Sequence, residues 1–313
     1  MSEVVKKATR DGFGEAITEL GLADRNIVVI DMDLGKSCKT GQFMKACPDQ
    51  YFDVGIAEQN GAGLAAGLAS CGKIPYVVTY AAFSSMRMLE MIRQEVCYTN
   101  LNVRIIGAHG GFTPAYDGAS HQAIEDMGIL RTIPNMTVVM PSDYVSAKKL
   151  VTASAYYEGP LYLRLTRDAI PVLYGEDEEF VIGKAHLVRE GGDAAILANG
   201  DTVRKAVEAA DLLAADGIRT RVLDVHTIKP LDAEAVTKAL TEIGKVVTVE
   251  DHNIIGGLGS AVCEVAAELG CGKVRRIGVQ DRFGESAPYE RLLEKNGITA
   301  ENIARTAKEL IGR

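Results

Sequence analysis

The sequence predicts an α/β protein of two domains, each with a parallel sheet covered by helices. Three observations predict this fold class. Short β-branched runs alternate with helical patterns along the chain, which is typical of parallel sheets with helices on both faces. The length of 313 residues suffices for two hydrophobic cores. The hydrophobic fraction of 47% and charged fraction of 24% are those of an ordinary globular protein.

The first half of the chain contains six predicted strands and four predicted helices. Runs rich in Val, Ile, Thr and Tyr indicate strands at 26–31, 51–55, 75–80, 103–108, 137–140 and 161–165. Helical patterns lie between them at 6–20, 58–70, 84–98 and 144–157. In the helix at 58–70, every residue after Asn60 is small or apolar. We therefore expect this helix to pack tightly on several sides.

A break separates the two halves at residues 171–180, which contain Pro171, Gly175 and four consecutive acids. Such a stretch is typical of a linker. We expect a first domain at 1–172, a linker at 173–184 and a second domain at 185–313. In the second domain, strands are predicted at 194–198, 219–224, 246–250 and 274–279, and helices at 203–215, 233–243, 258–269 and 300–310.

Composition excludes several classes of protein. The net charge of −8 argues against binding to nucleic acid or to acidic membranes. The polar N-terminus has no apolar signal core, and no apolar run is long enough to span a membrane. The six cysteines form no CxxC and no Cys/His zinc spacing. We expect a cytoplasmic protein with reduced thiols, and we assign no metal-ligating residue to this chain.

Glu58 is the only formal charge between Asp53 and Lys73, and it opens the predicted helix at 58–70. Burial of a carboxylate without a partner is costly. The residue could complement the helix macrodipole in the first turn, or it could take part in chemistry. Taken alone, the pattern favours the macrodipole.

The loop at 108–122 follows a predicted strand and carries His109, Asp117 and His121. Ligand sites in parallel α/β sheets form at the C-terminal ends of strands, and these side chains can transfer protons and bind hydroxyl groups. Two of the five histidines lie in this one Gly-rich loop. We therefore favour a functional loop over a surface loop with incidental polar residues. Their separation of 12 residues fits no common metal pattern.

Two glycine-rich segments admit alternative interpretations. The letters of Gly61-Ala-Gly-Leu-Ala-Ala66 match a dinucleotide fingerprint, but no acidic residue ends a strand about 20 residues later. We favour close helix packing at these glycines. The segment Gly256-Gly-Leu-Gly-Ser260 opens a predicted helix and could bind an anion there, or it could form a tight turn. We favour the turn.

Aromatic residues end one predicted strand at Tyr80 and Phe83, in a chain without Trp. They could stack on a flat ligand ring, although such residues more often belong to the core. Together and in this order, the segments resemble the pyrimidine-binding and C-terminal domains of transketolase, over nearly the whole chain. The resemblance rests on Gly55-Ile-Ala-Glu-Gln-Asn60, Thr79-Tyr-Ala-Ala-Phe-Ser84, His109 with Asp117-Gly-Ala-Ser-His-Gln-Ala-Ile-Glu-Asp126, and Leu165-Thr-Arg167.

The resemblance implies a fold, a reaction and a cofactor. The fold is a parallel-sheet pyrimidine-binding domain of the thiamine-diphosphate enzymes, followed by a smaller α/β transketolase C-terminal domain. The reaction transfers a two-carbon ketol unit from a ketose phosphate to an aldose phosphate in pentose phosphate metabolism. Glu58 would hydrogen-bond the aminopyrimidine ring of thiamine diphosphate and so assist deprotonation of the thiazolium carbon. Phe83 would stack on the pyrimidine, Tyr80 would lie on the same wall, and Asp33 would be a cofactor-side acid.

The resemblance also implies a set of substrate-binding residues. His121 would be catalytic as well, because it would bind substrate hydroxyls near the reacting carbons, and Asp117 would bind another hydroxyl. The planar guanidinium of arginine suits a phosphate group. The residues implied to hold the sugar phosphate are Arg10, Ser37, His109 and Arg167.

One family motif is missing from the sequence. In transketolases, Gly-Asp-Gly and a later Asn hold the cofactor diphosphate and its metal. The nearest match here is Asn199-Gly-Asp-Thr202, which lies in the wrong domain and lacks the second Gly. The resemblance is therefore to the C-terminal subunit of a split transketolase. Its partner would be a separate diphosphate-binding subunit that holds most of the cofactor together with Mg²⁺ or Ca²⁺. The implied assembly is an α2β2 heterotetramer with two copies of each chain, or a self-dimer of this chain.

Four other classes remain open. The beta subunit of a 2-oxoacid dehydrogenase decarboxylase shares the two-domain plan and the helix glutamate, but His109 and the motif from Asp117 to Gln122 resemble transketolase more. Deoxyxylulose-phosphate synthase has a similar portion within a longer chain. An NAD-dependent oxidoreductase would rest on the fingerprint at 61–66, and a non-catalytic structural subunit would retain only the fold.

Overall fold

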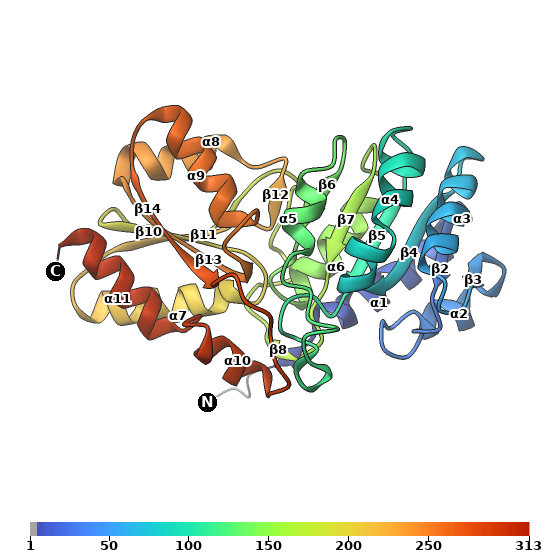
Figure 1. The fold of residues 1–313 in the computed structure, drawn as a ribbon, viewed down its shortest axis with the longest axis horizontal. Coiled ribbons are helices and arrows are strands. Elements are labelled where there is room, and N and C mark those ends of the chain that lie inside the picture. The colour runs from blue at the N-terminus through green and yellow to red at the C-terminus, as the bar shows by residue number, and fades with distance from the viewer. Residues whose placement is uncertain (1–4, 313) are drawn as a thin grey trace.

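The computed structural model describes residues 5–312, which form two α/β domains (Figure 1). Residues 1–4 and 313, including the start predicted to lack a signal sequence, lie outside the described residues. The main sheets have seven and five strands, and a third, two-stranded sheet pairs β1 (Lys6–Lys7) with β8 (Ile170–Pro171). The predicted fold class is confirmed.

The seven-stranded sheet forms the first domain and has the order β12-β6-β7-β5-β4-β2-β3. Six strands run parallel, and each lies within two residues of its predicted range. For the inner strands this agreement follows from their mostly apolar runs, which are typical of strands buried on both faces, whereas β3 is a partly exposed edge strand. The six are β2 (Ile27–Asp31), β3 (Tyr51–Asp53), β4 (Ile74–Tyr80), β5 (Arg104–Ala108), β6 (Thr137–Val139) and β7 (Leu161–Arg164).

The seventh strand, β12 (Thr227–Lys229), comes from the second half of the chain and pairs antiparallel with β6. The sheet is therefore parallel as predicted except at this edge. A three-residue strand is too short to show a sequence period, and only the packing of the two halves places it. Figure 1 shows β12 beside β6, where the second domain meets the first.

Helices cover both faces of the first sheet. On one face, α1 (Thr9–Ala23) and α6 (Tyr144–Ala155) build a core with Phe13, Phe43 and Leu150. On the other face lie α3 (Glu58–Ser70) and α5 (Asp126–Arg131). The first helix begins later than predicted because Lys6–Lys7 pair as β1. The short helix α2 (Gly41–Ala46) and the 3₁₀ turns Pro48–Gln50 and Ala115–Asp117 lie in loops.

The helix predicted at 84–98 is broken into three pieces. Two π-helical segments, Phe83–Arg87 and Ile92–Cys97, flank the short α4 (Leu89–Met91). The hydroxyl groups of Ser84 and Ser85 both donate to the carbonyl of Ala81. Such side-chain hydrogen bonds compete with the regular helical pattern, and π-turns are frequent at functional sites.

The five-stranded sheet of the second domain has the order β14-β13-β10-β11-β9. Its parallel strands are β10 (Ala194–Ala198), β11 (Thr220–Asp224), β13 (Lys245–Asn253) and β14 (Lys273–Val279), and β9 (His186–Arg189) is an antiparallel edge that was not predicted. The helices are α7 (Thr202–Ala215), α8 (Ala233–Lys238), which continues as a π-turn at Ala239–Ile243, α9 (Leu258–Leu269), α10 (Tyr289–Lys295) and α11 (Ala300–Ile311). The short α10 was also not predicted.

One hydrophobic core continues from the first domain into the second. It joins Met127 and Met140 to Leu223, Val225 and Ile228. Residues 171–185 connect the domains and contain no helix and no strand beyond Pro171. Within residues 5–312, no helix has both the length and the apolar character needed to cross a membrane.

Candidate functional site

Five neighbouring parallel strands position the predicted site residues. The loop after β2 carries Asp33 and Ser37, and the chain after β3 leads to Glu58 at the start of α3. Tyr80 ends β4, and His109 and Arg167 follow β5 and β7. Because the carboxyl ends of parallel strands meet at one edge of the sheet, these residues converge there.

Glu58 is 3% exposed at the first position of α3. The nearest cation is Arg87, whose Nη1 lies 3.5 Å from the Glu58 Oε2. The guanidinium of Arg87 also lies over the Phe83 ring, 5.0 Å from its centroid. Sequence reasoning missed Arg87, although its place four residues after Phe83 is the spacing at which side chains meet on a helix. The carboxylate of Glu58 therefore has Arg87 as a partner in addition to the helix macrodipole.

Four rings form an aromatic wall, defined here as Tyr80, Phe83, His109 and His121. The Tyr80 ring centroid lies 4.4 Å from that of His109 and 5.9 Å from that of His121. Phe83 meets His121 edge-on at 5.4 Å and lies 6.2 Å from Tyr80. The hydroxyl of Ser120 bonds the Nδ1 of His121 at 2.9 Å. The wall joins residues predicted for the cofactor to residues predicted for the substrate.

His109 is buried and adopts a left-handed backbone conformation with φ of 59°. Its Nε2 lies 3.4 Å from Nη1 of Arg10. Burial lowers the pKa of His109 to about 3, helped by the nearby charges of Arg10 and Arg167. His109 is thus neutral at neutral pH, so its ring can donate or accept hydrogen bonds but carries no charge. Its Nδ1 is buried and has no hydrogen-bond partner within residues 5–312.

Two arginines flank His109. Arg10 on α1 donates to the backbone carbonyl of Ser37 at 2.8 Å. Arg167 donates to the carbonyl of Pro114 at 3.2 Å and forms an ion pair with Asp117 at 3.3 Å. These side chains are partly exposed. The structure therefore brings together the four residues predicted to hold the sugar phosphate, Arg10, Ser37, His109 and Arg167, which are called the phosphate cluster here. Asp117 is a counterion of Arg167 that the sequence did not indicate.

Asp33 lies at the margin of this arrangement. It is exposed and has a left-handed φ of 59°. Its backbone N–H donates to Oδ1 of Asp53 at 3.2 Å, and the same oxygen accepts from Gly55 N–H at 2.9 Å. Asp33 is thereby tied to the segment that leads into α3, through an acid that sequence reasoning did not single out.

The two glycine-rich segments have structural explanations. A Cβ on Gly61 would lie 2.1 Å from Cε of Met32, which agrees with close packing of α3. Gly256 has a left-handed φ of 86°, as expected of a turn. The buried carboxylate of Glu250 accepts hydrogen bonds from the N–H groups of Leu258 at 2.7 Å and Gly259 at 2.8 Å. The start of α9 therefore binds an anion supplied by the protein itself.

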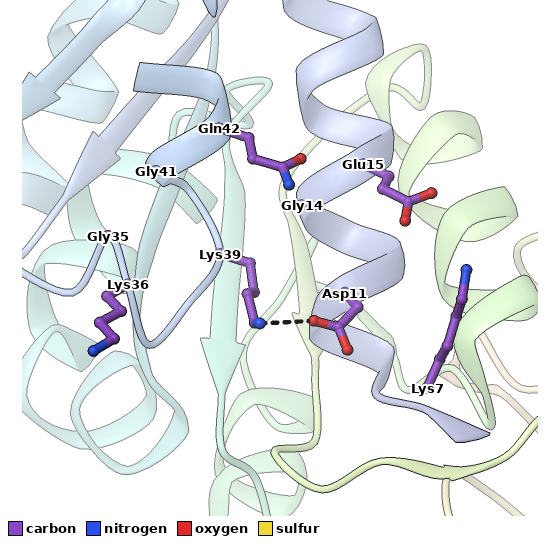
Figure 2. Close-up of a pocket in the computed structure, with 9 residues that line it drawn as sticks. All are labelled: Lys7, Asp11, Gly14, Glu15, Gly35, Lys36, Lys39, Gly41 and Gln42. Atoms are coloured by element: carbon purple, nitrogen blue, oxygen red, sulfur yellow. Dashed lines mark ion pairs between the residues drawn. The ribbon is translucent and has the colours of Figure 1, made fainter. Parts of the chain in front are cut away.

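A cavity of about 350 Å³ lies beside the phosphate cluster, between α1 and the loop that follows β2. Figure 2 shows Lys39 reaching across it to Asp11, with which it forms an ion pair at 3.0 Å. Two residues that line the cavity, Asp11 and Lys36, are next in sequence to Arg10 and Ser37. The cavity borders the site but is not lined by the aromatic wall. Residues 5–312 contain no cluster of three or more His, Cys, Asp or Glu placed to hold a metal ion.

Comparison with known proteins agrees with this architecture. Residues 5–172 match the transketolase pyrimidine-binding domain, and residues 183–303 match the transketolase C-terminal domain. A solved structure described as a split gene transketolase, inactive beta4 tetramer, superposes with a TM-score of 0.91 at 44% identity, covering 97% of this chain and 98% of that one. The fold and site thus define a transketolase-type pair of domains.

Two relatives are similar over nearly their whole lengths. A Methanocaldococcus jannaschii protein, provisionally named a transketolase C-terminal section, is 44% identical over 97% of this chain and 96% of its own. A 6-deoxy-6-sulfo-D-fructose transketolase subunit of Clostridium sp. is 41% identical over 97% of this chain and 94% of its own. The chain belongs to the transketolase family.

Proposed function

We propose that this chain is the C-terminal subunit of a thiamine-diphosphate-dependent transketolase, which transfers a two-carbon ketol unit from a ketose phosphate to an aldose phosphate. The observation that supports this most is the convergence, at one sheet edge, of a buried carboxylate, an aromatic wall and two arginines. Glu58 with Phe83 suits a flat nitrogen heterocycle, and Arg10 with Arg167 suits an anionic sugar.

The residues present fit the pyrimidine half of the cofactor. Glu58 is a buried carboxylate that can hydrogen-bond a ring nitrogen, and the Phe83 ring beside it already has the planar guanidinium of Arg87 against its face. Thiamine diphosphate, when bound, supplies the electron sink for breaking the carbon–carbon bond of the ketose. Glu58 would hold the ring and move a proton at its nitrogen, while Tyr80 would close the wall. Mg²⁺ or Ca²⁺ would be held with the diphosphate, mainly by the partner, and Asp33 would lie on the cofactor side.

The remaining residues suit a phosphorylated sugar. His121, on the aromatic wall, would bind substrate hydroxyls near the reacting carbons, and Asp117 would bind a further hydroxyl. The phosphate would lie among Arg10, Ser37, His109 and Arg167, where neutral His109 offers a hydrogen bond and the arginines offer charge. Pentose phosphates are our proposed substrates. The sulfonated sugar in the name of the clostridial relative is an anion of related shape and a substrate to test beside them.

We also propose that a separate diphosphate-binding subunit completes the site. The absence of Gly-Asp-Gly from the sequence supports this, as does the similarity to an inactive beta4 tetramer of a split gene transketolase. Two copies of each chain would give an α2β2 heterotetramer. The site residues lie on loops at an edge of the sheet, which a second subunit could cover.

Reconstitution tests the proposal. The chain would be assayed alone and together with a diphosphate-binding transketolase subunit, with thiamine diphosphate and Mg²⁺, for transfer from xylulose 5-phosphate to ribose 5-phosphate. We expect transfer by the mixture only. Transfer by the single chain would contradict the need for a partner, and decarboxylation of pyruvate in place of transfer would contradict the reaction. Parallel assays with 6-deoxy-6-sulfofructose would show which anion the site prefers.

A further inference from the structure

The loop at residues 109–122 is held by the second domain, although the site residues it carries belong to the first. The backbone N–H of Phe112 donates to Oδ2 of Asp251, on β13, at 2.9 Å. Near the other end of the loop, Nε2 of Gln122 donates to the carbonyl of Glu285 at 2.9 Å and to Ala115 within the loop at 3.0 Å. Two contacts, Phe112 with Asp251 and Gln122 with Glu285, therefore hold the loop from outside its own domain. We call these two contacts the clamp.

The clamp is closely packed. A Cβ on Gly111, which has a φ of 60°, would lie 2.1 Å from Oδ2 of Asp251. A Cβ on Gly284 would lie 1.7 Å from Oε1 of Gln122. The two surfaces thus approach closely enough to exclude side chains at both contacts, and a small displacement of β13 would move the loop with it.

Arg164 connects the clamp to the phosphate cluster. Its Nη2 donates to the backbone carbonyls of Ala123, just after the loop, at 2.7 Å and of Asp251 at 2.9 Å. Its Nε lies 3.0 Å from Oδ2 of Asp126, and both side chains are fully buried. Arg164 ends β7, three residues before Arg167. One guanidinium therefore joins β7, which precedes Arg167, to the end of the loop and to β13.

The charges around Asp251 make it a costly residue for this position. It is fully buried, and the like charges of Asp126 and Asp201 lie nearby, with Arg164 as the cation that offsets them. Burial raises the pKa of Asp251 to about 6, although Arg164 and the Phe112 N–H oppose the shift. A buried carboxylate is weak as a source of stability. Its specific bond to the loop gives it a positional role instead.

We propose that Asp251 is a positioning residue that fixes the loop at 109–122, so that the second domain sets the affinity of the site for its sugar substrate. The statement about substrate rests on the proposed function, whereas the statement about the loop does not. Asp251 acts through the N–H of Phe112, which lies three residues after His109 and five before Asp117.

Hydrogen exchange of the chain itself tests the clamp. Asp251→Ala removes the acceptor, Asp251→Asn retains an oxygen at the same place, and Asp232→Ala is the matched control. Asp232 is another buried acid of the second domain, which accepts from the N–H groups of Ala235 at 3.1 Å and Ala185 at 3.0 Å. We expect exchange in 110–122 to be about tenfold faster in Asp251→Ala, the factor that a charge-assisted hydrogen bond supplies. Asp251→Asn should restore slow exchange, and Asp232→Ala should leave it unchanged. Wild-type exchange in Asp251→Ala would overturn the proposal.

A second variant covers the case in which Asp251→Ala fails to fold. Gln122→Met is nearly isosteric and removes the Nε2 group, which donates to Glu285 in the second domain and to Ala115 within the loop. Faster exchange of 110–122 in this variant supports the clamp, and unchanged exchange overturns it.

Kinetics with the partner subunit separate the clamp from the reaction. In Asp251→Ala, KM for the ketose phosphate should rise about tenfold with a smaller change in kcat, because the loop is displaced while Glu58 is not. Asp232→Ala should behave as wild type. If Asp251→Ala and Asp232→Ala had equal KM values in an assay where the wild type is active, the clamp proposal would be overturned and the proposed function would not. A wild type without transfer would instead overturn the proposed function, and the exchange experiment would still decide the clamp.

Discussion

A carboxylate can be buried at Glu58 because two features of its surroundings favour the charge. The first turn of α3 presents backbone N–H groups, and Arg87 lies 3.5 Å away. Arg87 is itself half exposed, so the pair contributes little to stability. Arg87 also lies over the ring of Phe83, so the carboxylate and this ring share one cationic neighbour.

We predict that Glu58→Gln abolishes transfer in the assembled enzyme without unfolding the chain. Gln has the same shape but cannot exchange a proton with a ring nitrogen, so kcat should fall by about 10²–10⁴-fold. Steady-state kinetics with thermal unfolding of the same samples provide the measurement. Glu90→Gln, at an exposed acid of α4, is the control. Turnover near that of wild type would return Glu58 to a structural role.

We predict that Arg167→Ala raises KM for phosphorylated donors by about 10–100-fold, the range of a charged hydrogen bond, and changes KM for an unphosphorylated ketose much less. The reason is that Arg167 lies beside His109 and Arg10 and would bind the phosphate rather than the reacting carbons. Arg189→Ala is a matched control, because Arg189 forms a similar surface ion pair with Asp211. Equal effects on both donors would remove the phosphate role.

Among the secondary-structure elements, the contact of α1 with α6 matters most for the site, because α1 carries Arg10. A Cβ on Gly12 would lie 2.5 Å from the backbone carbonyl of Tyr144 and 3.2 Å from the N of Lys148. The helices can approach this closely only because the residue is glycine. The ion pair of Lys148 with Glu19 borders the same contact at 2.7 Å.

We predict that Gly12→Ala lowers the free energy of unfolding by about 1–3 kcal/mol, because the methyl group meets backbone atoms that cannot move aside. Gly67→Ala is the matched control. Gly67 lies on exposed α3 surface with open space around its Cβ position. This change should stabilise the chain by up to about 1 kcal/mol through helix propensity. Denaturant unfolding of the isolated chain measures both, and equal signs would contradict the packing argument.

For the whole molecule, a few buried carboxylates join the two domains. Asp143 caps α6 and also accepts from the N–H groups of Leu173 at 2.9 Å and Tyr174 at 3.0 Å, in the segment that connects the domains. The hydroxyl of Tyr174 donates to Asp224, at the end of β11, at 2.7 Å. The connecting segment is therefore attached to both domains.

This arrangement predicts a pH dependence of stability. Burial raises the pKa of Asp224 from 3.8 to about 7, against the hydrogen bond from Tyr174. Between these values the folded state binds a proton that the unfolded state does not. The free energy of unfolding therefore falls as pH rises through this window.

Asp224→Asn cannot titrate and can still accept from Tyr174. Between about pH 5 and about pH 8 it should lose about 2–3 kcal/mol less stability than wild type. Denaturant unfolding at several pH values measures the difference. Asp211→Asn, at an exposed carboxyl, should follow the wild-type curve. Parallel curves for Asp224→Asn and wild type would contradict the prediction.

Much of the fold could be predicted because its strands are apolar runs and its long helices have apolar faces. The strand at Ala194–Ala198 and the helix at Leu258–Leu269 match the predicted ranges, whereas β1, β8, β9, β12, α2, α5 and α10 were not predicted. The missed elements are all short, and the missed strands lie at sheet edges or pair with each other in the two-stranded sheet. Their positions depend on packing partners distant in sequence, and local pattern carries no record of those partners.

The sequence by itself determined the fold class, the family resemblance and most of the residues that meet at the sheet edge, from Arg10 to Arg167. Apart from Arg10, which lies on α1, those residues follow strands, and the topology of a parallel sheet brings strand ends together. Only the tertiary structure decided that Arg87 pairs with Glu58, that Glu250 fills the start of α9, and that Asp251 holds the loop of His109. Asp251 lies 139 residues from Phe112 along the chain. A contact of that kind depends on how two domains pack, and neither segment shows it alone.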